Sequence, residues 1–231
     1  MLHANREALL ASAKASKLAY NDVRAIGKRN VLGFDVDTII KKSGIEVYVL
    51  RPVGDKKGST MTVAFKGSTT WKDIRRFLRL SPERFAFKDA NVCIHSGVLR
   101  MFEDIESELT MAIPRTLAPN KVTFVGHSMG GSLAMLASAY YGDMCAGNLK
   151  TKCHIFGAPR MGDAAFHNWR ARYVEQHLSV INVNDLIASV PFGFGYEPNP
   201  HPIVLPQRRR RVVNPHDISN YITNIQGTRN L

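Results

Sequence analysis

The sequence predicts an α/β fold in which helices cover both faces of a mostly parallel central sheet. Segments with strand-like and helix-like patterns alternate along the 231 residues, which is typical of parallel sheets with helical connections. Hydrophobic residues make up 45% of the chain and charged residues 22%, a balance typical of globular proteins. Because no internal repeat and no Gly/Ser-rich linker interrupts the chain, we expect residues 1–231 to form a single domain.

The individual elements follow from local composition. Runs of apolar and β-branched residues predict strands, whereas longer amphipathic stretches predict helices. Pro114 ends one of these helices, and a turn rich in Gly and Lys at 53–59 separates the first two strands. In chain order we expect a helix over 5–20, strands over 45–50 and 60–65, a helix over 71–80, a strand over 92–95, a helix over 97–113, a strand over 122–125, a helix over 129–141, and strands over 154–156 and 179–183.

The chain carries a large excess of positive charge. Its 31 Lys and Arg residues against 19 Asp and Glu residues give a formal net charge of +12. Such an excess favours association with anionic partners, either lipid headgroups or nucleic acid, and says little about the fold. The positive charge is concentrated over 66–88 and in the run Arg208–Arg211. That run either binds anions or forms a charged edge strand that prevents strand pairing.

Targeting and redox features of the sequence favour an intracellular protein. No apolar stretch approaches the ~20 residues that a spanning helix needs. Charged residues among the alanines of the first twenty residues do not fit a secretory signal. The odd set of Cys93, Cys145 and Cys153 indicates reduced thiols, although a Cys145–Cys153 bridge stays open. Their spacing fits no metal site, so we expect neither a metal nor another cofactor.

One motif points to a candidate catalytic serine. The residues Gly126-His127-Ser128-Met129-Gly130 form a G-x-S-x-G pattern. Four β-prone residues precede it and a helix rich in small residues follows, which is the strand–turn–helix context of a nucleophile elbow. The serine must adopt a strained conformation to expose its hydroxyl, and this is tolerable only where neighbouring positions lack side chains. The N-terminus of the following helix then favours negative charge that develops beside Ser128.

A histidine base is expected after the serine, because triads of this type follow the order serine, acid, histidine. We prefer His216, which lies in a polar turn just before a C-terminal helix or strand. His201, between two prolines, is its rival. The other histidines are interpreted as structural: His154 opens an expected strand, and His167 and His177 lie on a polar stretch that we expect to be helical.

The acid of the triad is expected after a buried strand and before the histidine. Asp185 fits this position because it directly follows the apolar stretch 179–184. Asp163 is the competitor, although its position is more typical of a turn or a helix cap. Asp217 is adjacent to His216 in the sequence and is therefore poorly placed to bond to that ring.

Four stretches of the chain together resemble the class 3 (fungal-type) lipase family of the α/β-hydrolase superfamily. They are Val63–Thr69, Val92–Val98, Phe156–Asp163, and the pair Asn184-Asp185 with the later His216. The resemblance implies an α/β-hydrolase fold with a short helical lid and a triad of Ser128, Asp185 and His216. It also implies an oxyanion hole formed by Ser68 and the backbone amide of Met129. Lys66 departs from the pattern, since the family usually has arginine there.

The same resemblance implies an enzyme that cleaves carboxylic esters of lipids through an acyl-enzyme, as a lipase or carboxylesterase. The alternative within catalysis is a phospholipase A or acyltransferase that acts on anionic lipids. The alternative of another class is a basic membrane- or nucleic-acid-binding module without catalysis. An intact serine, acid and histidine set argues against this last alternative, so we expect a lipid or ester substrate and no specific nucleic-acid partner.

In the family a helical lid follows the oxyanion segment, and residues 70–90 match it here. The helix expected at its start separates apolar and basic residues onto two faces. The apolar face holds Trp71, Ile74, Phe77 and Leu78, and the basic face holds Lys72, Arg75, Arg76 and Arg79. A basic amphipathic helix of this kind suits an anionic membrane surface. The simpler interpretation is a surface helix docked on the core. Both interpretations hold if the helix docks on the core in a closed state and moves outward at a lipid surface.

Overall fold

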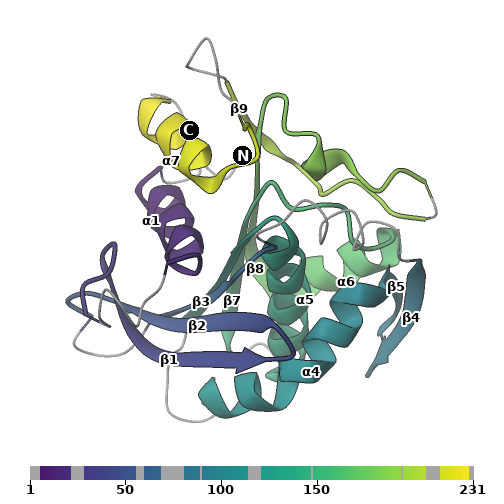
Figure 1. Ribbon diagram of the computed structural model, residues 1–231. Helices are drawn as coiled ribbons and strands as arrows, with labels where there is room; N and C mark the ends of the chain where they lie inside the picture. The colour runs from purple at the N-terminus through teal and green to yellow at the C-terminus, as the bar shows by residue number, and fades with distance from the viewer. Residues whose placement is uncertain are drawn as a thin grey trace.

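The computed structural model describes residues 6–21, 29–55, 60–68, 81–88, 90–113, 121–146, 148–193, 195–206 and 214–228. Its centre is a seven-stranded sheet with the strand order β1-β2-β3-β6-β7-β8-β9 (Figure 1). The strands are β1 Phe34–Lys42, β2 Ile45–Pro52, β3 Thr60–Phe65, β6 Lys121–His127, β7 Lys150–Phe156, β8 Val174–Asn182 and β9 Ile203–Leu205. The first three strands pair antiparallel and all pairs from β3 onward are parallel, which confirms the mostly parallel sheet.

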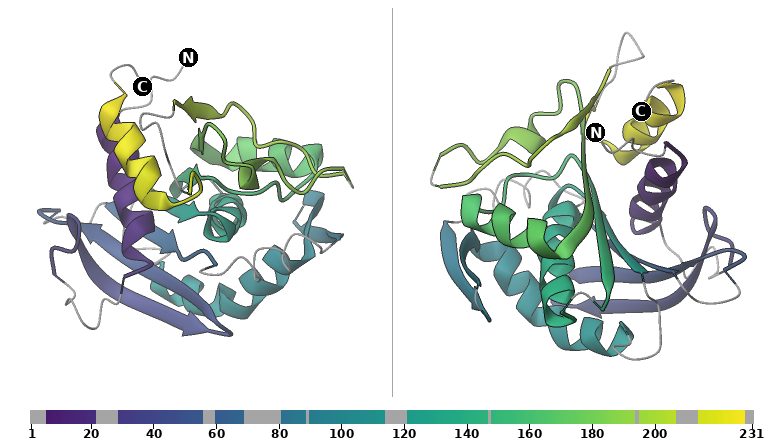
Figure 2. Two further views of the ribbon diagram at one scale, coloured as in Figure 1. Left: turned by 45° about the horizontal axis from the view of Figure 1, so that its top comes forward. Right: turned by 180° about the vertical axis from the view of Figure 1, so that it is seen from behind.

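Helices cover both faces of this sheet, as expected. They are α1 Arg6–Leu18, α4 Ser96–Ala112, α5 Met129–Met144, α6 Ala164–Tyr173 and α7 Ile218–Gly227. The purple helix α1 and the yellow helix α7 lie side by side on one face, and α4, α5 and α6 cover the other (Figures 1 and 2). None of the helices in these described ranges has the length and apolar character needed to cross a membrane.

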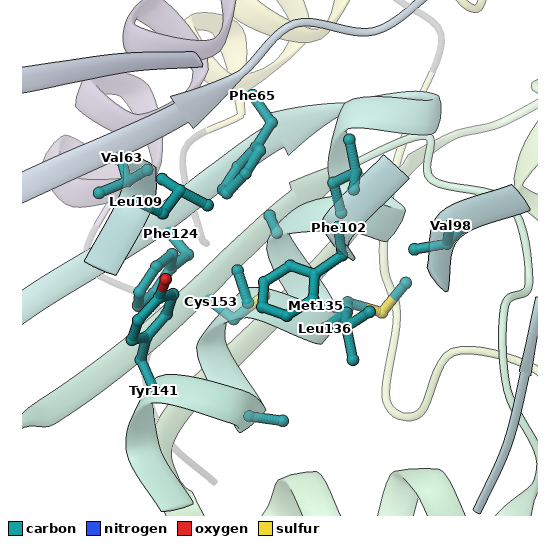
Figure 3. Packing of buried hydrophobic residues seen from close by; sticks show 14 of the residues in the cluster. Val63, Phe65, Val98, Phe102, Leu109, Phe124, Met135, Leu136, Tyr141 and Cys153 are labelled. Atoms are coloured by element: carbon teal, nitrogen blue, oxygen red, sulfur yellow. The ribbon is translucent and has the colours of Figure 1, made fainter. Parts of the chain in front are cut away.

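The alternation of side chains along the strands builds a core on each face of the sheet. In β3, Val63 and Phe65 belong to the large cluster under α4 and α5, whereas Ala64 packs on the opposite face with residues of α1. Figure 3 shows the large cluster, in which Phe102 of α4 lies close to Met135 and Leu136 of α5. The two clusters hold the ends of β3 and β6 in fixed positions, and the candidate active site is built at these two strand ends.

A second, two-stranded sheet occupies part of the expected lid. Strands β4 Pro82–Phe87 and β5 Ala90–His95 pair antiparallel. Residues 82–87 of the expected lid-like segment 70–90 therefore form a strand, in which Phe85 and Phe87 lie on the same face and pack against Trp169 of α6. Two expected features lie outside the described residues. They are the amphipathic helix, with Trp71, Ile74, Phe77 and Leu78, and the run Arg208–Arg211.

Other expectations also change. Strands β1 and β9 are not predicted from the sequence. His177 is expected on a helical stretch but lies in β8, opposite Cys153 of β7. Three polar residues, Glu175 to His177, separate the buried Val174 from the run of buried residues that begins at Leu178, and so obscure the strand pattern. Cys145 and Cys153 are not joined by a disulfide, so the bridge that was left open does not form.

Candidate active site

Ser128 lies in a sharp turn between β6 and α5. Its backbone has φ 57° and ψ −133°, a positive φ that is unfavourable for a residue with a side chain. Two glycines make the turn possible by removing side chains from close approaches. A Cβ on Gly126 would lie 2.1 Å from the Gly130 carbonyl oxygen, and a Cβ on Gly130 would lie 2.3 Å from the Phe65 carbonyl oxygen. This strained turn has the geometry expected of a nucleophile elbow.

Ser128, His216 and Asp185 form a continuous chain of buried hydrogen bonds. His216 Nδ1 lies 2.8 Å from Asp185 Oδ2, and His216 Nε2 lies 2.8 Å from Ser128 Oγ. Because the Asp185 carboxylate can only accept, Nδ1 of His216 carries the hydrogen of the neutral ring. The other nitrogen, Nε2, therefore accepts the hydrogen bond of the Ser128 hydroxyl and is free to take its proton.

The carboxylate of Asp185 is held by three donors. The Ile187 backbone N–H donates to Oδ1 at 3.0 Å, while His216 and the Tyr221 hydroxyl donate to Oδ2. Burial alone would raise the pKa of Asp185, but these hydrogen bonds and the charge of His216 outweigh it and lower that pKa below its ordinary value. Asp185 is therefore an anion at neutral pH and can stabilise a positive charge on His216.

The competing acids have structural positions. Asp163 caps the N-terminus of α6, where it accepts from the Phe166 N–H at 2.7 Å, and it also accepts from the Cys93 N–H at 3.1 Å. Asp217 caps α7 and accepts from the Ser219 N–H at 2.7 Å. Both carboxylates satisfy backbone donors, which is the role expected for Asp163 if it is not the acid.

The competing histidines lie elsewhere in the fold. His201 is exposed in the loop between β8 and β9. His154 lies 2.7 Å from the Ser12 hydroxyl and 3.2 Å from Gln176 Oε1, so its two ring nitrogens join α1, β7 and β8. His167 belongs to α6 and His177 to β8. The hydrogen bond to Ser128 is made by His216, which is the base preferred from the sequence.

Two residues expected at the oxyanion hole, Ser68 and Met129, lie together beside Ser128. The Ser68 hydroxyl is 3.4 Å from the Met129 sulfur. Gly67 approaches the elbow so closely that a Cβ there would lie 3.3 Å from the Ser128 Cβ. As the first residue of α5, Met129 has a backbone N–H without a partner inside the helix, at its positive end. The arrangement suits a site where negative charge develops next to Ser128.

Tyr20 and His127 form a hydrogen-bond network that no sequence motif indicates. His127 Nε2 faces the carbonyl oxygen of His216, which can only accept, so Nε2 carries the hydrogen of the neutral ring. Nδ1 of His127 therefore accepts from the Tyr20 hydroxyl, which lies 2.9 Å away. Burial and the neighbouring His216 lower the pKa of His127 to about 3, so this ring stays neutral.

Tyr20 extends this network to the oxyanion segment. Burial raises the pKa of Tyr20, and the backbone N–H of Gly67, which hydrogen-bonds to its oxygen, opposes that rise. A Cβ on Gly67 would lie 2.4 Å from that hydroxyl oxygen. One tyrosine thus joins the strand end at Gly67 to the elbow at His127 and, through it, to the backbone of His216. No local pattern could reveal this, because Tyr20 and His127 are 107 residues apart.

Comparison with known proteins identifies the family. The sequence model of the family described as Lipase (class 3) matches residues 62–194, more than half of the chain. This chain belongs to the class 3 lipase family. A lipase of Rhizomucor miehei is 23% identical over 184 residues, which cover 76% of this chain and 47% of the relative. The secreted mono- and diacylglycerol lipase 1 of Fusarium solani is 24% identical over 67% of this chain and 46% of its own length.

The fold of this family member is also that of a solved fungal lipase. A Rhizomucor miehei lipase propeptide complex superposes with a TM-score of 0.73 at 18% identity, over 95% of this chain and 75% of that one. This likeness shows the α/β-hydrolase fold. The chain spans about half the length of the curated relatives that it matches. The matched residues 62–194 include Ser68, Ser128 and Asp185 but end before His216, so the position of His216 depends on the hydrogen bonds described above.

In the part of the chain that the structure describes, no group of three or more His, Cys, Asp and Glu side chains could hold a metal ion.

Proposed function

We propose that this member of the class 3 lipase family is a serine hydrolase that cleaves carboxylic esters of lipids. The observation that carries the proposal is the hydrogen-bonded chain from Ser128 through His216 to Asp185, with 2.8 Å at each step. In such a chain the histidine can take the serine proton while the hydroxyl attacks. The single large sheet from β1 to β9 supports treating residues 1–231 as one hydrolase domain.

In the proposed reaction, Ser128 Oγ attacks the ester carbonyl carbon while His216 Nε2 takes its proton. The carbonyl oxygen becomes an anion and is stabilised by the amides of Ser68 and Met129 at the positive end of α5. His216 then donates the proton to the leaving alcohol, the carbon–oxygen bond breaks, and the acyl group stays on Ser128. Water then attacks the acyl carbon while His216 Nε2 takes its proton. The bond between that carbon and Ser128 Oγ breaks, His216 returns the proton to Oγ, and the carboxylic acid leaves.

The surroundings of the site favour a lipid as the ester. Leu186 and Phe192 follow Asp185 and are 75% and 66% exposed, which is high for large apolar side chains. Exposed apolar groups beside an active site suit contact with lipid. The curated relatives named above are a lipase and a mono- and diacylglycerol lipase, which also supports this substrate class.

We infer that the lipid surface is anionic. The chain has a formal net charge of +12, and the guanidinium of Arg160 lies 5.3 Å from the ring centroid of Phe192, within the apolar surface beside the site. Basic side chains near an anionic bilayer each contribute about 1 kcal/mol of binding. The basic residues among 72–79 would add to this attraction at the membrane.

The proposal is tested by labelling with a fluorophosphonate and by hydrolysis of p-nitrophenyl esters. We expect the wild type to be labelled at Ser128, and Ser128→Ala to lose both labelling and turnover. Asp185→Asn should lower kcat on the order of 10⁴-fold, because the carboxylate that orients and stabilises the histidine is lost. Asp163→Asn is the matched control. Its one amide oxygen can still accept from the Phe166 N–H at the start of α6, and loss of the hydrogen bond from Cys93 should lower stability and not kcat.

Two results would contradict the proposal: turnover that survives in Ser128→Ala, or a loss in Asp163→Asn equal to that in Asp185→Asn. Product analysis then separates the candidate substrates. Release of fatty acid from neutral glycerides supports a lipase, whereas release from phosphatidylglycerol alone would assign the phospholipase alternative.

A further inference from the structure

A cavity of about 390 Å³ opens beside the oxyanion residues. We call it the hairpin pocket, because the turn between β1 and β2 forms one wall. Its other walls come from the end of β3, from α4 and from the start of α5. Its lining includes Ile45, Glu46, Lys66, Ser68, Met101 and Met129. The volume lies in the range of small-molecule sites and has room for about a dozen water-sized groups at ~30 Å³ each.

The lining of the hairpin pocket combines apolar and ionic side chains. Ile45, Met101 and Met129 supply the apolar part, and methionine side chains adapt easily to a flexible chain. Lys66 and Glu46 supply the ionic part. The pocket therefore suits a group that combines a few carbon atoms with a charged end.

The ionic part of the pocket carries a net positive charge. Lys66 Nζ lies 2.7 Å from Glu46 Oε1, and Lys41 Nζ lies 2.6 Å from Glu46 Oε2. Burial would raise the pKa of Glu46, but hydrogen bonds from Lys41, Lys66 and the Tyr48 hydroxyl outweigh it and lower that pKa to about 2. Glu46 is thus a carboxylate shared by two ammonium groups, which leaves one positive charge in excess.

Lys66 can bind a further anion without losing its partner. An ammonium group has three N–H donors, and Glu46 accepts one of them through Oε1. The Lys66 side chain is 24% exposed and lines the pocket, so its amine is reachable from within the cavity. A carboxylate at the end of a bound chain would lie next to this amine and would be attracted by the excess positive charge.

The strand order places the hairpin pocket on one side of Ser128 and the base on the other. The pocket is built from β2 and β3, which precede β6 in the sheet, whereas Asp185 follows β8 on the other side of β6. His216 must lie next to the leaving alcohol, because it protonates that oxygen. The alcohol part of the ester therefore lies toward His216, and the acyl part extends toward the pocket.

We propose that the hairpin pocket is a subsite for the acyl part of the ester and selects short acyl chains that end in a carboxylate. This inference rests on the proposed hydrolase function and names the substrate class that the same site would prefer. The ester carbonyl would lie between Ser128 and the oxyanion amides, the carbon chain against Ile45, Met101 and Met129, and the carboxylate beside Lys66.

The test compares two soluble esters with the same leaving group and acyl chain length, p-nitrophenyl pentanoate and mono-p-nitrophenyl glutarate. We measure the ratio of their kcat/KM values, glutarate over pentanoate, in the wild type and two variants. Lys66→Gln should lower the ratio about tenfold, because one positive charge next to the carboxylate is lost. Glu46→Gln should raise it severalfold, because the local charge increases by one.

Arg51→Gln is the matched control. It also removes one positive charge from β2, where Arg51 pairs with Asp37, but Arg51 lies six residues beyond Ile45, roughly 20 Å along the strand. Its ratio should equal that of the wild type. The wild-type preference for glutarate should also decrease as ionic strength rises, because the attraction is electrostatic.

Each ratio is measured within one protein, so a partial loss of folding affects both substrates equally. If Lys66→Gln does not fold, the opposite shift in Glu46→Gln still tests the proposal. A ratio unchanged in both variants, or changed in the same direction in both, overturns the acyl subsite. That failure differs from failure of the proposed function, which would appear as pentanoate turnover that persists in Ser128→Ala.

Discussion

The network around Tyr20 leads to a prediction that separates stability from catalysis. Tyr20→Phe removes one oxygen, the donor to His127 Nδ1 at 2.9 Å. His127 is only 5% exposed, so water cannot readily replace that donor. Leaving a buried acceptor unpaired reduces the free energy of unfolding by about 1–3 kcal/mol. For a chain of this size that lowers Tm by roughly 3–10 °C, measurable by thermal unfolding.

The same substitution should slow catalysis, because His127 donates to the carbonyl oxygen of His216 and Tyr20 contacts the oxyanion segment at Gly67. We expect kcat for p-nitrophenyl pentanoate to fall about tenfold, the effect of a small misplacement of the reacting groups. KM should change little, since Tyr20 does not line the hairpin pocket.

Tyr140→Phe is the control for this prediction. It removes the same atom from a hydrogen bond, 3.0 Å long, that joins Tyr140 of α5 to Glu106 of α4. Tyr140 lies roughly 18 Å along α5 from Ser128. The substitution should lower Tm without changing kcat. If Tyr20→Phe also lowers Tm and leaves kcat at the wild-type value, Tyr20 has a purely structural role and the positioning argument is wrong.

Two further predictions concern pH and membranes. Burial lowers the pKa of His154 and His167 to about 4 and that of His177 well below 6.5, so below pH ~6.5 the unfolded chain binds more protons than the folded one. The free energy of unfolding in urea should therefore fall as the pH falls below ~6.5, by up to about 1.4 kcal/mol per pH unit for each histidine that stays neutral in the folded state, and a flat profile would contradict this. Replacing Lys72, Arg75 and Arg76 by Glu should weaken co-sedimentation with anionic vesicles at least a hundredfold, while turnover of a soluble ester persists. Equal vesicle binding by the wild type and this variant would exclude the segment from the membrane-binding surface.

The sequence predicts the parts of the site that depend on local chemistry. The elbow requires small residues around a strained serine, and Gly126 and Gly130 meet that requirement within a few residues of Ser128. The choice of Asp185 over Asp163 also follows from local context, since a residue at a helix start already has backbone donors to satisfy. These positions could be predicted because the physical constraint and the residues that answer it are neighbours in the chain.

What the sequence does not predict depends on residues that meet only in the folded chain. Tyr20 and Tyr221 carry no motif, yet their hydroxyls complete the surroundings of His127 and Asp185. The hairpin pocket needs β2, β3 and two helices together before its shape exists. The sequence predicts a helical stretch at His177 because the polar residues 175–177 lack the alternation of a typical strand, and pairing with β7 determines the conformation there.

The pairing of α1 with α7 has a consequence for when activity begins. Leu9 and Ala13 of α1 pack with Ile218 and Tyr221 of α7, next to Tyr20 and His216. The residues that close the site thus come from opposite ends of the described chain, and contacts between such distant segments form late in folding. A chain with its parallel strands assembled but α1 and α7 apart has its nucleophile in place and no base to activate it. Partly folded or nicked molecules would therefore lack the proposed ester hydrolysis.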